Sequence, residues 1–514
     1  MMVLVRAQIE QPIIAVAAHL EPQNVRRIGP PCGQVGRFGG YVGQPFNNAH
    51  WHLLTSACGR RMPWRQPARN QNILFVWIDD NNNIWRIFLY NQTRDNDGSD
   101  RIPGAPEGAV QRRFGPLPDG GALMAGADPW SPLELRCGRI LRNRFLLAPM
   151  TTDSSHEDGI VSGDELSYIE RRCSTEFAAG ITACAYVDDN GRAWRGIGAN
   201  RDEHHDSLRR LAEAVRAGGG HAILQLYDSG RLARPDLVAP ADMRAPSSIA
   251  SLRPGAHVPR AMDGDEVVDI IHAFVGAARR GIDAGFDGIE LHGGNHYLLH
   301  QFFSPRANAR EDDWGGLQEK RMSFGLCLAT AVRKAIGSSA LLGYRVNPFE
   351  AEPGGYSLSD AAEFVSRLCE VGLDYIHISM DDFRKRSPQR EDRDWTAPEG
   401  QVGAENPIEV LSRAVQGRAA VIASGGIRTA ADAVEALAMG ADLLAIGRAA
   451  LIDPEWITKL KQDDEAAIRT ALPATAERIA AELTMPARMV DYILSRPNWL
   501  RREDGLGIAG EGRI

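Results

Sequence analysis

The sequence predicts an α/β protein whose main domain is a (β/α)8 barrel of the TIM type. From Trp130 onward, short apolar β-like runs alternate with amphipathic helical patterns. Eight such alternations fit a closed barrel better than a doubly wound sheet, because no nucleotide-type G-x-G-x-x-G follows the first strand. In such barrels the chemistry lies at the carboxyl ends of the strands, so functional residues are sought there.

Each expected strand precedes a helical pattern. The pattern from Asp263 to Ala284 begins with acidic residues and is followed by Gly285, which suits the helix dipole and a left-handed stop. The eight expected strands are Phe145 to Met150, Gly180 to Val187, His221 to Leu226, Gly288 to His292, Leu341 to Asn347, Tyr375 to Ser379, Ala420 to Ser424 and Leu443 to Gly447.

The composition is that of an ordinary globular protein, with 514 residues of which 44% are hydrophobic and 24% charged. The formal net charge of -8 leaves no basic surplus, so binding to nucleic acid or to an anionic membrane is disfavoured. The 7 cysteines are scattered without a C-x-x-C pair, which predicts neither an iron–sulfur cluster nor a structural zinc site. We therefore expect a soluble, cytoplasmic protein without a metal.

Residues 1–123 differ from the rest of the chain. They contain no lysine, are rich in Arg, Asn, Gly and Pro, and carry one hairpin-like stretch from Asn72 to Tyr90. We expect a poorly ordered extension without a catalytic role, or a start assigned too early, since Met124 directly precedes the first barrel element. Residues 124–470 are the expected barrel, and residues 471–514 form a helical segment with a frayed tail from Arg501 to Ile514.

Polar side chains follow the expected fourth strand in the order His292, Asn295 and Tyr297. Histidine and asparagine at this spacing can donate hydrogen bonds to one carbonyl or oxyanion, and a tyrosine can supply a proton. The same groups can also merely satisfy buried backbone atoms. The motif therefore indicates an active site only together with other residues.

Two glycine-containing turns follow the seventh and eighth strands. Gly425 and Gly426 come before Thr429, a good N-cap for a helix from Ala430, and Gly447 comes before Arg448. Glycine lets backbone N–H groups approach a phosphate, and an arginine can pair with it. These turns predict a bound phosphoryl group, and by themselves they fit FMN and a sugar phosphate equally well.

Two further residues favour a flavin. Gln225 ends the third strand and Arg345 ends the fifth, so both should reach the same barrel mouth. An amide can bond the pyrimidine edge of a flavin, and a fixed cation stabilises the anionic reduced ring. Arg345 alone would more often be an ion-pair partner.

With these residues assembled, the stretch from about Pro132 to about Trp456 resembles the Old Yellow Enzyme family of NAD(P)H:flavin oxidoreductases. The resemblance rests on several motifs in order, which makes it specific. They are Leu147 to Thr152, Gln225 with Gly230-Arg231, Ala284 to Gly288 leading into His292, Asn308 to Arg310, and Asp312 to Gly316 with Arg321.

The resemblance implies a role for each matched position around an FMN at the barrel mouth. His292 and Asn295 would bind the activating oxygen of the substrate, and Tyr297 would be the proton donor. NADH or NADPH would reduce the flavin, and hydride would then pass to an electron-poor alkene in ping-pong order. For the cofactor, the resemblance implies that Pro149 and Met150 pack on the flavin ring, Thr151 bonds near O4, Gln225 and Arg345 hold the pyrimidine edge, and Gly425, Gly426, Gly447 and Arg448 hold the phosphate.

Three residues depart from the family pattern. His296 stands where glycine is common, Asp228 where many relatives carry histidine, and Cys184 where a small residue is usual. The first two bear on substrate scope, and we interpret Cys184 as a packing residue.

The leading hypothesis is an ene-reductase acting on a small electrophilic substrate, with a homo-oligomer as an open possibility. A second hypothesis keeps FMN and makes the acceptor a quinone, a nitro compound or oxygen. A third, from another class, is a barrel that binds FMN or phosphate without catalysis. The set of His292, Asn295 and Tyr297 favours the first.

Overall fold

The computed structural model describes residues 128–387, 405–496 and 499–505, together with the backbone of four strands nearer the N-terminus. The chain divides into two compact units, Met1–Gly121 and Ala122–Ile514.

The first unit contains a sheet of four strands in the order β1-β2-β3-β4. Strands β3 (Asn72–Ile78) and β4 (Ile84–Asn91) pair antiparallel, so the predicted hairpin is confirmed. Strands β1 (Met2–Leu4) and β2 (Ile13–Ala17) complete the sheet. The predicted turn between β3 and β4, and the expectation of a poorly ordered extension, fall outside the described residues.

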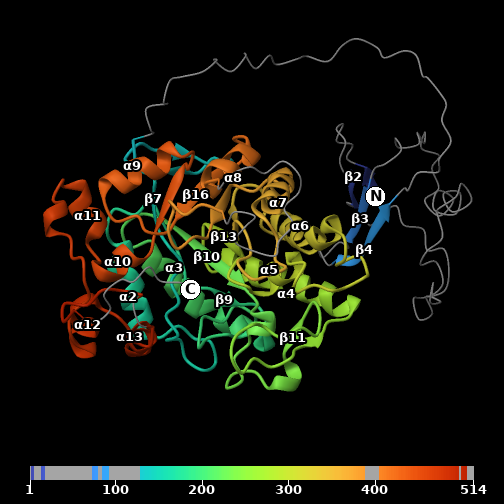
Figure 1. The fold of residues 1–514 in the computed structure, drawn as a ribbon, viewed down its shortest axis with the longest axis horizontal. Coiled ribbons are helices and arrows are strands. Elements are labelled where there is room, and N and C mark those ends of the chain that lie inside the picture. Colours follow the sequence, from blue (N-terminus) through green and yellow to red (C-terminus); the bar gives the residue numbers. More distant parts are fainter. Residues whose placement is uncertain are drawn as a thin grey trace, which may run out of the picture. The chain divides into compact units, whose positions relative to one another are not determined.

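The second unit is the predicted (β/α)8 barrel (Figure 1). Its eight parallel strands follow one another in chain order, and the last pairs with the first, which closes the ring. The barrel strands are β7 (Phe145–Leu147), β8 (Ala179–Ile181), β10 (His221–Tyr227), β13 (Gly288–Gly293), β14 (Leu341–Val346), β15 (Tyr375–Ile378), β16 (Ala420–Ser424) and β17 (Leu443–Ile446).

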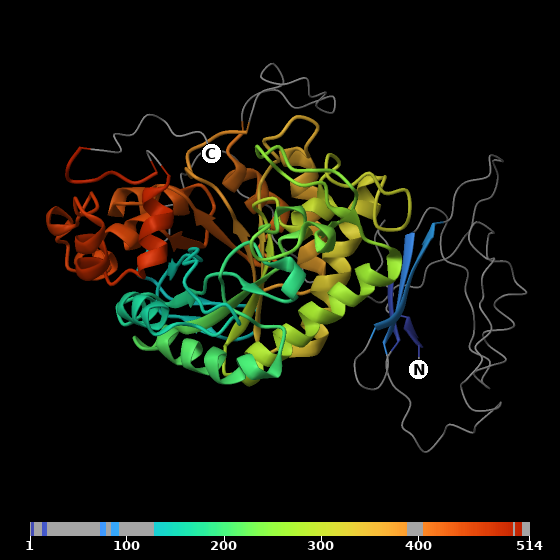
Figure 2. The same ribbon diagram turned by 90° about the horizontal axis from the view of Figure 1, so that it is seen from below.

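Helices surround the strands, as the two ribbon views show (Figures 1 and 2). The expected helix from Asp263 is α4, and Asp263 caps it through a reciprocal bond with Glu266. Thr429 likewise caps α9, as predicted. The main helices around the barrel are α2 (Gly163–Cys173), α3 (His205–Val215), α4 (Gly264–Asp283), α6 (Gln318–Ile336), α7 (Leu358–Glu370), α8 (Pro407–Val415), α9 (Ala430–Ala438), α10 (Arg448–Ile452) and α11 (Trp456–Lys461).

The second strand is broken where the sequence predicted a continuous run to Val187. Strand β8 stops at Ile181, and a separate short strand, β9 (Ala185–Tyr186), pairs further along β10. Between them the backbone N–H of Gln225 donates to the hydroxyl of Thr182 at 3.2 Å. Because a side chain takes the place of a strand carbonyl there, the ladder is interrupted.

A Gly-x-Asp pattern recurs before three barrel strands. In each case the glycine has a positive φ, and the aspartate accepts a hydrogen bond from a backbone N–H at the start of the preceding barrel strand. Asp287 binds Ala222 at 2.9 Å in this way. The pattern therefore ends a helix and joins two strands at the end of the barrel opposite the mouth. The aspartates are Asp287, Asp374 and Asp442.

Two helices follow the barrel, α12 (Ala476–Leu483) and α13 (Ala487–Leu494), drawn in red in Figure 1. Their buried side chains, including Ile479 and Met489, attach them to the rest of the unit. The tail from Arg501 was expected to be frayed, but its first residues pair with Leu472, whose N–H donates to the Arg501 carbonyl at 2.8 Å and whose carbonyl accepts from the Glu503 N–H at 2.9 Å. The rest of the expected tail, beyond Gly505, lies outside the described residues.

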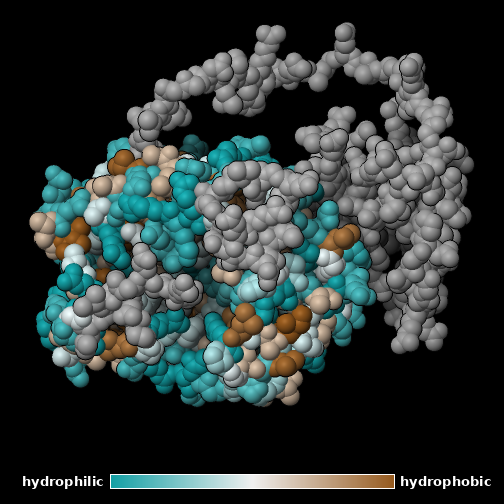
Figure 3. Space-filling view, viewed as in Figure 1, coloured by the Kyte–Doolittle hydropathy of each residue, from teal (hydrophilic) through white to brown (hydrophobic). Residues whose placement is uncertain are grey.

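The exposed surface of the described residues is mainly hydrophilic in the view of Figure 3, with hydrophobic residues in small separate groups. Among the described helices, none combines the length and the apolar character needed to cross a membrane.

Candidate active site

The register of the strands brings the predicted residues together at the barrel mouth. His292 of β13 lies opposite Arg345 of β14, and Arg345 lies opposite His377 of β15. Gln225 of β10 lies opposite Glu290 of β13. Alternate residues of a strand point to the same side, so Glu290 and His292 face the same interior.

A buried hydrogen-bonded group closes the floor of this interior. Gln225 donates from Nε2 to Glu290 at 2.6 Å, and His377 Nδ1 lies 3.0 Å from the other oxygen of Glu290. Burial raises the pKa of Glu290, but His377, Arg345 and Gln225 outweigh it and hold that pKa below its usual range. The carboxylate of Glu290 therefore fixes the amide of Gln225. No pattern in the sequence pointed to Glu290.

A second chain of contacts links strand β14 to the segments that follow β15 and β13. Arg345 donates from Nη2 to the hydroxyl of Ser379 at 2.9 Å, and that hydroxyl donates to Asn295 Oδ1 at 3.3 Å. Burial lowers the pKa of Arg345, and the carboxylate of Glu290 opposes this shift. Ser379 was predicted only as the end of a strand, and here it ties Arg345 to Asn295.

His292 is almost fully buried and holds its proton on the nitrogen that faces Asn295. The backbone N–H of Gly294 donates to Nδ1 at 3.3 Å, which places the proton of the neutral ring on Nε2. The amide nitrogen of Asn295 is also a donor and lies 3.5 Å from Nε2, so the two groups do not bond each other and both can donate to a ligand. Burial, with Arg345 and His377 nearby, lowers the pKa of His292 far below its usual value. His292 is thus a neutral hydrogen-bond donor at physiological pH.

Tyr297 packs edge-on against His292, with ring centroids 5.0 Å apart. Its hydroxyl accepts a hydrogen bond from the indole Nε1–H of Trp194 at 2.8 Å, which leaves the tyrosine O–H free to donate. Burial raises its pKa, so the phenol stays protonated. Trp194 packs in turn on Tyr492 of α13, at 5.1 Å between centroids. No pattern in the sequence connects Trp194 and Tyr492 with this site, because only the fold brings them beside Tyr297.

The predicted phosphate residues meet at the segment Met380 to Asp382. Gly425 has φ +101°, and a Cβ there would lie 2.5 Å from the carbonyl oxygen of Met380. Arg448 donates from Nη2 to the carbonyl of Asp381. The N–H of Met380 donates to the hydroxyl of Ser424 at 3.3 Å. Met380 directly follows Ser379, which bonds Asn295, so the predicted phosphate residues adjoin the residues around Asn295. Gly426, also at positive φ, lies next to the side chain of Asp382.

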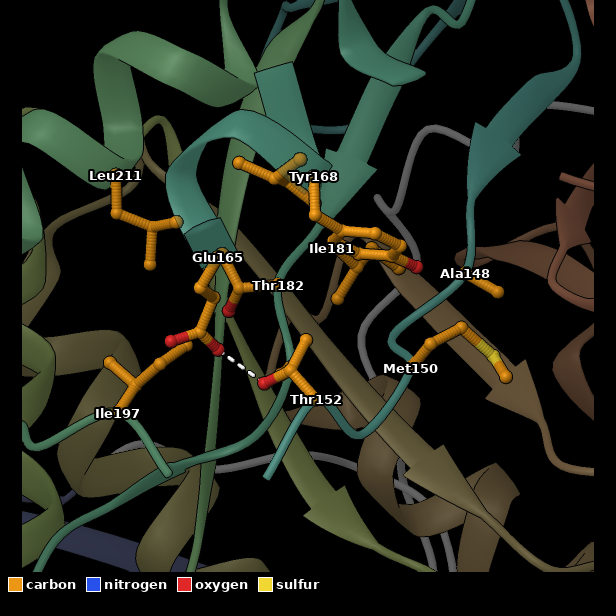
Figure 4. A pocket seen from close by; sticks show the side chains of 11 residues that line it. Ala148, Met150, Thr152, Glu165, Tyr168, Ile181, Thr182, Ile197 and Leu211 are labelled. Carbon is orange, nitrogen blue, oxygen red and sulfur yellow. Dashed lines mark hydrogen bonds between the residues drawn. The ribbon is translucent and has the colours of Figure 1, made fainter. Parts of the chain in front are cut away.

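The loop after β7 brings Met150 to Gly447, where an added Cβ would lie 2.9 Å from the methionine sulfur. Pro149 and the half-buried Thr151 flank Met150 along the chain. Behind this loop lies a small, mainly apolar cavity, in which Thr152 donates to the buried Glu165 (Figure 4). Burial raises the pKa of Glu165. The bond to Glu165 anchors the loop that presents Met150.

The departures from the family pattern have distinct places. Asp228 is fully buried, accepts from the N–H of Gly230 at 2.8 Å and lies 3.5 Å from Arg244, so it supports a turn. Cys184 is buried in an aromatic cluster with Tyr227 and Tyr297, which agrees with a packing role. His296 has φ +61° and lies between Asn295 and Tyr297.

Comparison with known proteins agrees with the fold. Residues 130–466 match the NADH:flavin oxidoreductase / NADH oxidase family. A probable NADH-dependent flavin oxidoreductase of Bacillus subtilis is 35% identical over 73% of this chain and 98% of that protein. An NADH:fumarate oxidoreductase of Klebsiella pneumoniae is 36% identical over 65% of this chain, but the match spans only 36% of that protein.

A solved structure of morphinone reductase in complex with tetrahydroNAD superposes with a TM-score of 0.54, at 26% identity over 65% of this chain and 91% of that one. The chain therefore belongs to the NADH:flavin oxidoreductase / NADH oxidase family, which confirms the resemblance to Old Yellow Enzyme. It is an FMN oxidoreductase that uses a reduced nicotinamide as electron donor.

The described residues fit an FMN. A Cβ at Gly425 would meet the carbonyl of Met380, and one at Gly447 would meet the sulfur of Met150, so neither turn has room for a side chain. Turns without side chains leave backbone N–H groups accessible to a phosphate. The Nε of Arg345 is buried without a hydrogen-bond partner, so the guanidinium has a donor to spare. The roles of the individual residues toward the flavin ring and its phosphate remain predictions.

Proposed function

We propose that this enzyme reduces electron-poor C=C bonds, with His292, Asn295 and Tyr297 as the residues that touch the substrate. The observation that carries the proposal is their arrangement: two neutral hydrogen-bond donors lie beside a phenol whose O–H is free to donate. The fumarate activity named for the Klebsiella relative is also directed at an activated alkene, although this chain matches only part of that protein.

The chain's own residues divide the work between charge and proton. His292 Nε2–H and the amide of Asn295 bind the carbonyl oxygen of the substrate and stabilise the negative charge that develops on it. Burial of the site strengthens these hydrogen bonds, because little water competes. Bound FMN supplies hydride to the alkene.

Tyr297 delivers the proton that completes the reduction. Its O–H donates, while the indole of Trp194 bonds the same oxygen and stabilises the phenolate that remains. The phenol recovers its proton from solvent before the next turnover. Arg345 and Gln225 would hold the flavin edge and stay in place throughout.

The decisive measurement is an anaerobic absorbance spectrum before and after addition of NADH and then of NADPH. We expect a flavin spectrum that bleaches with one of these donors and recovers when an enone or another activated alkene is added. Recovery with a quinone but with no alkene would support the alternative acceptor. A bound flavin that neither donor bleaches would favour the non-catalytic alternative and contradict the proposal.

A further inference from the structure

Two imidazoles and a carboxylate converge beside the catalytic loop, outside the set of residues that the proposed reaction uses. His296 follows Asn295, His300 lies in α5 (Leu298–Phe303), and Glu350 follows β14. Glu350 Oε1 lies 3.6 Å from His296 Nδ1 and 3.5 Å from His300 Nε2. The three donor atoms all lie within 4.8 Å of one another.

These contacts are not ordinary hydrogen bonds. Both N···O distances exceed the usual 2.7–3.2 Å, and Nε2 of His300 is fully buried without a hydrogen-bond partner. A buried polar atom of this kind calls for an explanation.

The distances fit a metal ion instead. Zinc binds imidazole nitrogen and carboxylate oxygen at about 2.0–2.2 Å, which places neighbouring ligand atoms of a tetrahedron about 3.4 Å apart. The two measured N···O distances are close to that edge. The remaining edge joins His296 Nδ1 and His300 Nε2. His296 is partly exposed, so a small movement of its side chain can bring this N···N distance to the same length.

The surroundings hold these ligands in place, as outer contacts do in zinc sites. Ser304 donates from Oγ to the second oxygen of Glu350 at 2.6 Å. The hydroxyl of Tyr356 lies 3.4 Å from His300 Nδ1, and it also donates to the carbonyl of Asn347 at 3.1 Å. Gln301 donates to the backbone carbonyl of His296 at 2.7 Å.

We propose that His296 Nδ1, His300 Nε2 and Glu350 Oε1 bind a divalent zinc ion, with water as the fourth ligand on the exposed side of His296. Two imidazoles, one carboxylate and an open position form a ligand set that zinc uses in proteins. The proposal departs from the expectation of a protein without a metal, which rested on the scattered cysteines. It does not depend on which acceptor the flavin reduces.

Nearby charges set a limit on the affinity. Arg231 and Arg306 oppose a cation, and Glu352 lies 3.6 Å and 2.9 Å from their guanidinium groups. Glu350 carries the remaining negative charge of this group. The site should therefore bind zinc less tightly than a site built from thiolates.

The consequence concerns the loop between β13 and α5. His296 stands between Asn295 and Tyr297, and both His296 and Asn295 have positive φ values, at 61° and 55°. A metal held by His296 would tie this unusual backbone to α5 and to the loop after β14. The ion would act as a support for the positions of Asn295 and Tyr297.

The test uses the untagged full-length holoenzyme, stripped with a chelator and titrated with zinc against a chromophoric competitor. We expect one zinc per chain in the wild type. The variant His296→Gly removes a ligand at a φ that glycine adopts freely, so it should fold and retain FMN while binding zinc at least about 100-fold more weakly. Glu350→Gln, which keeps the side-chain shape, should weaken binding as well.

The matched control is His257→Gly, which makes the same change at an exposed loop position. It should bind zinc like the wild type. Zinc should raise the melting temperature of the wild type and of this control but not that of His296→Gly. Cobalt should give the wild type absorption bands beyond the flavin spectrum that the His296→Gly variant lacks. The proposal is overturned if the wild type binds no stoichiometric zinc, or if His296→Gly binds it equally well.

Discussion

His292 and Tyr297 show how the surroundings of a residue decide what it can do. Each is buried and uncharged, and each has its proton directed by a neighbour: Gly294 fixes the tautomer of His292, and Trp194 occupies the acceptor position of Tyr297. A histidine in water would be partly charged near neutral pH. In this site burial and Arg345 keep it neutral.

Replacing Tyr297 with phenylalanine should separate the two half-reactions. The variant keeps the ring packed on His292 and loses only the hydroxyl, so NADH should still reduce the flavin at a near-normal rate. Alkene reduction should fall roughly 10²- to 10⁴-fold, the usual contribution of a positioned acid. Stopped-flow absorbance of each half-reaction measures this. Unchanged alkene turnover would contradict the assignment of the proton donor.

The pH dependence of alkene reduction should show no titration of His292. Because its pKa lies well below 6.5, lowering the pH through 6.5 leaves the ring neutral, and the number of donors to the substrate stays constant. The rate of flavin reoxidation by an alkene, measured from pH 6 to 8, should therefore be flat. A rate that changes with an apparent pKa near 6.5, and that no longer does so in His292→Asn, would contradict this.

At the scale of elements, the active site depends on parts of the chain that lie far apart in sequence. Helix α13 reaches the proton donor through Tyr492 and Trp194, and the loop after β16 meets the segment that follows β15. Neither contact follows from a local pattern. The C-terminal segment is thus part of the structure that positions Tyr297.

Shortening Tyr492 to alanine should lower alkene reduction about 2- to 10-fold, because an aromatic pair contributes about 0.5–1.5 kcal/mol and Trp194 would lose one partner. Reduction of the flavin by NADH should not change. Tyr492→Phe retains the ring and serves as the control. Equal losses in both half-reactions would instead indicate a general disturbance of the fold.

Gly425→Ala should weaken FMN binding by at least about tenfold, since the added Cβ meets the Met380 carbonyl at 2.5 Å and the left-handed backbone disfavours alanine. Gly417→Ala provides the comparison. Gly417 also has a positive φ, at 68°, but its Cβ would meet nothing within 4 Å, and it precedes β16 at the opposite end of the strand. Fluorescence titration with FMN should show a normal affinity for this control.

At the scale of the whole molecule, the two ends of the barrel have different tasks. The mouth holds the candidate active site, and the opposite end holds the three Gly-x-Asp turns that join neighbouring strands. Asp287 there accepts from Arg139 at 2.8 Å and from Arg216 at 3.0 Å. These contacts stabilise the fold without touching the mouth.

Asp287→Asn should lower the free energy of unfolding by about 1–2 kcal/mol, because the buried carboxylate loses its charge but its arginine partners are partly exposed and solvent screens the pairs, while FMN affinity stays normal. Burial raises the pKa of Asp287, but His221, Arg216 and the Ala222 N–H hold it below its usual range. Its stabilisation is therefore present above about pH 4 and is lost as the pH falls toward the lower, folded-state pKa. Urea unfolding of both proteins from pH 3 to 7 tests this, and the difference should shrink at the acid end.

The sequence by itself determined the barrel, the order of its strands and the residues at their carboxyl ends. Apolar periodicity identifies each strand, and a parallel barrel brings all carboxyl ends to one face, so His292, Arg345 and Gly425 could be placed without a structure. Only the tertiary structure decided the partners of these residues. Glu290 with His377, Trp194 with Tyr492, and His296 with Glu350 meet through strand register and loop packing, which couple positions with no shared local pattern.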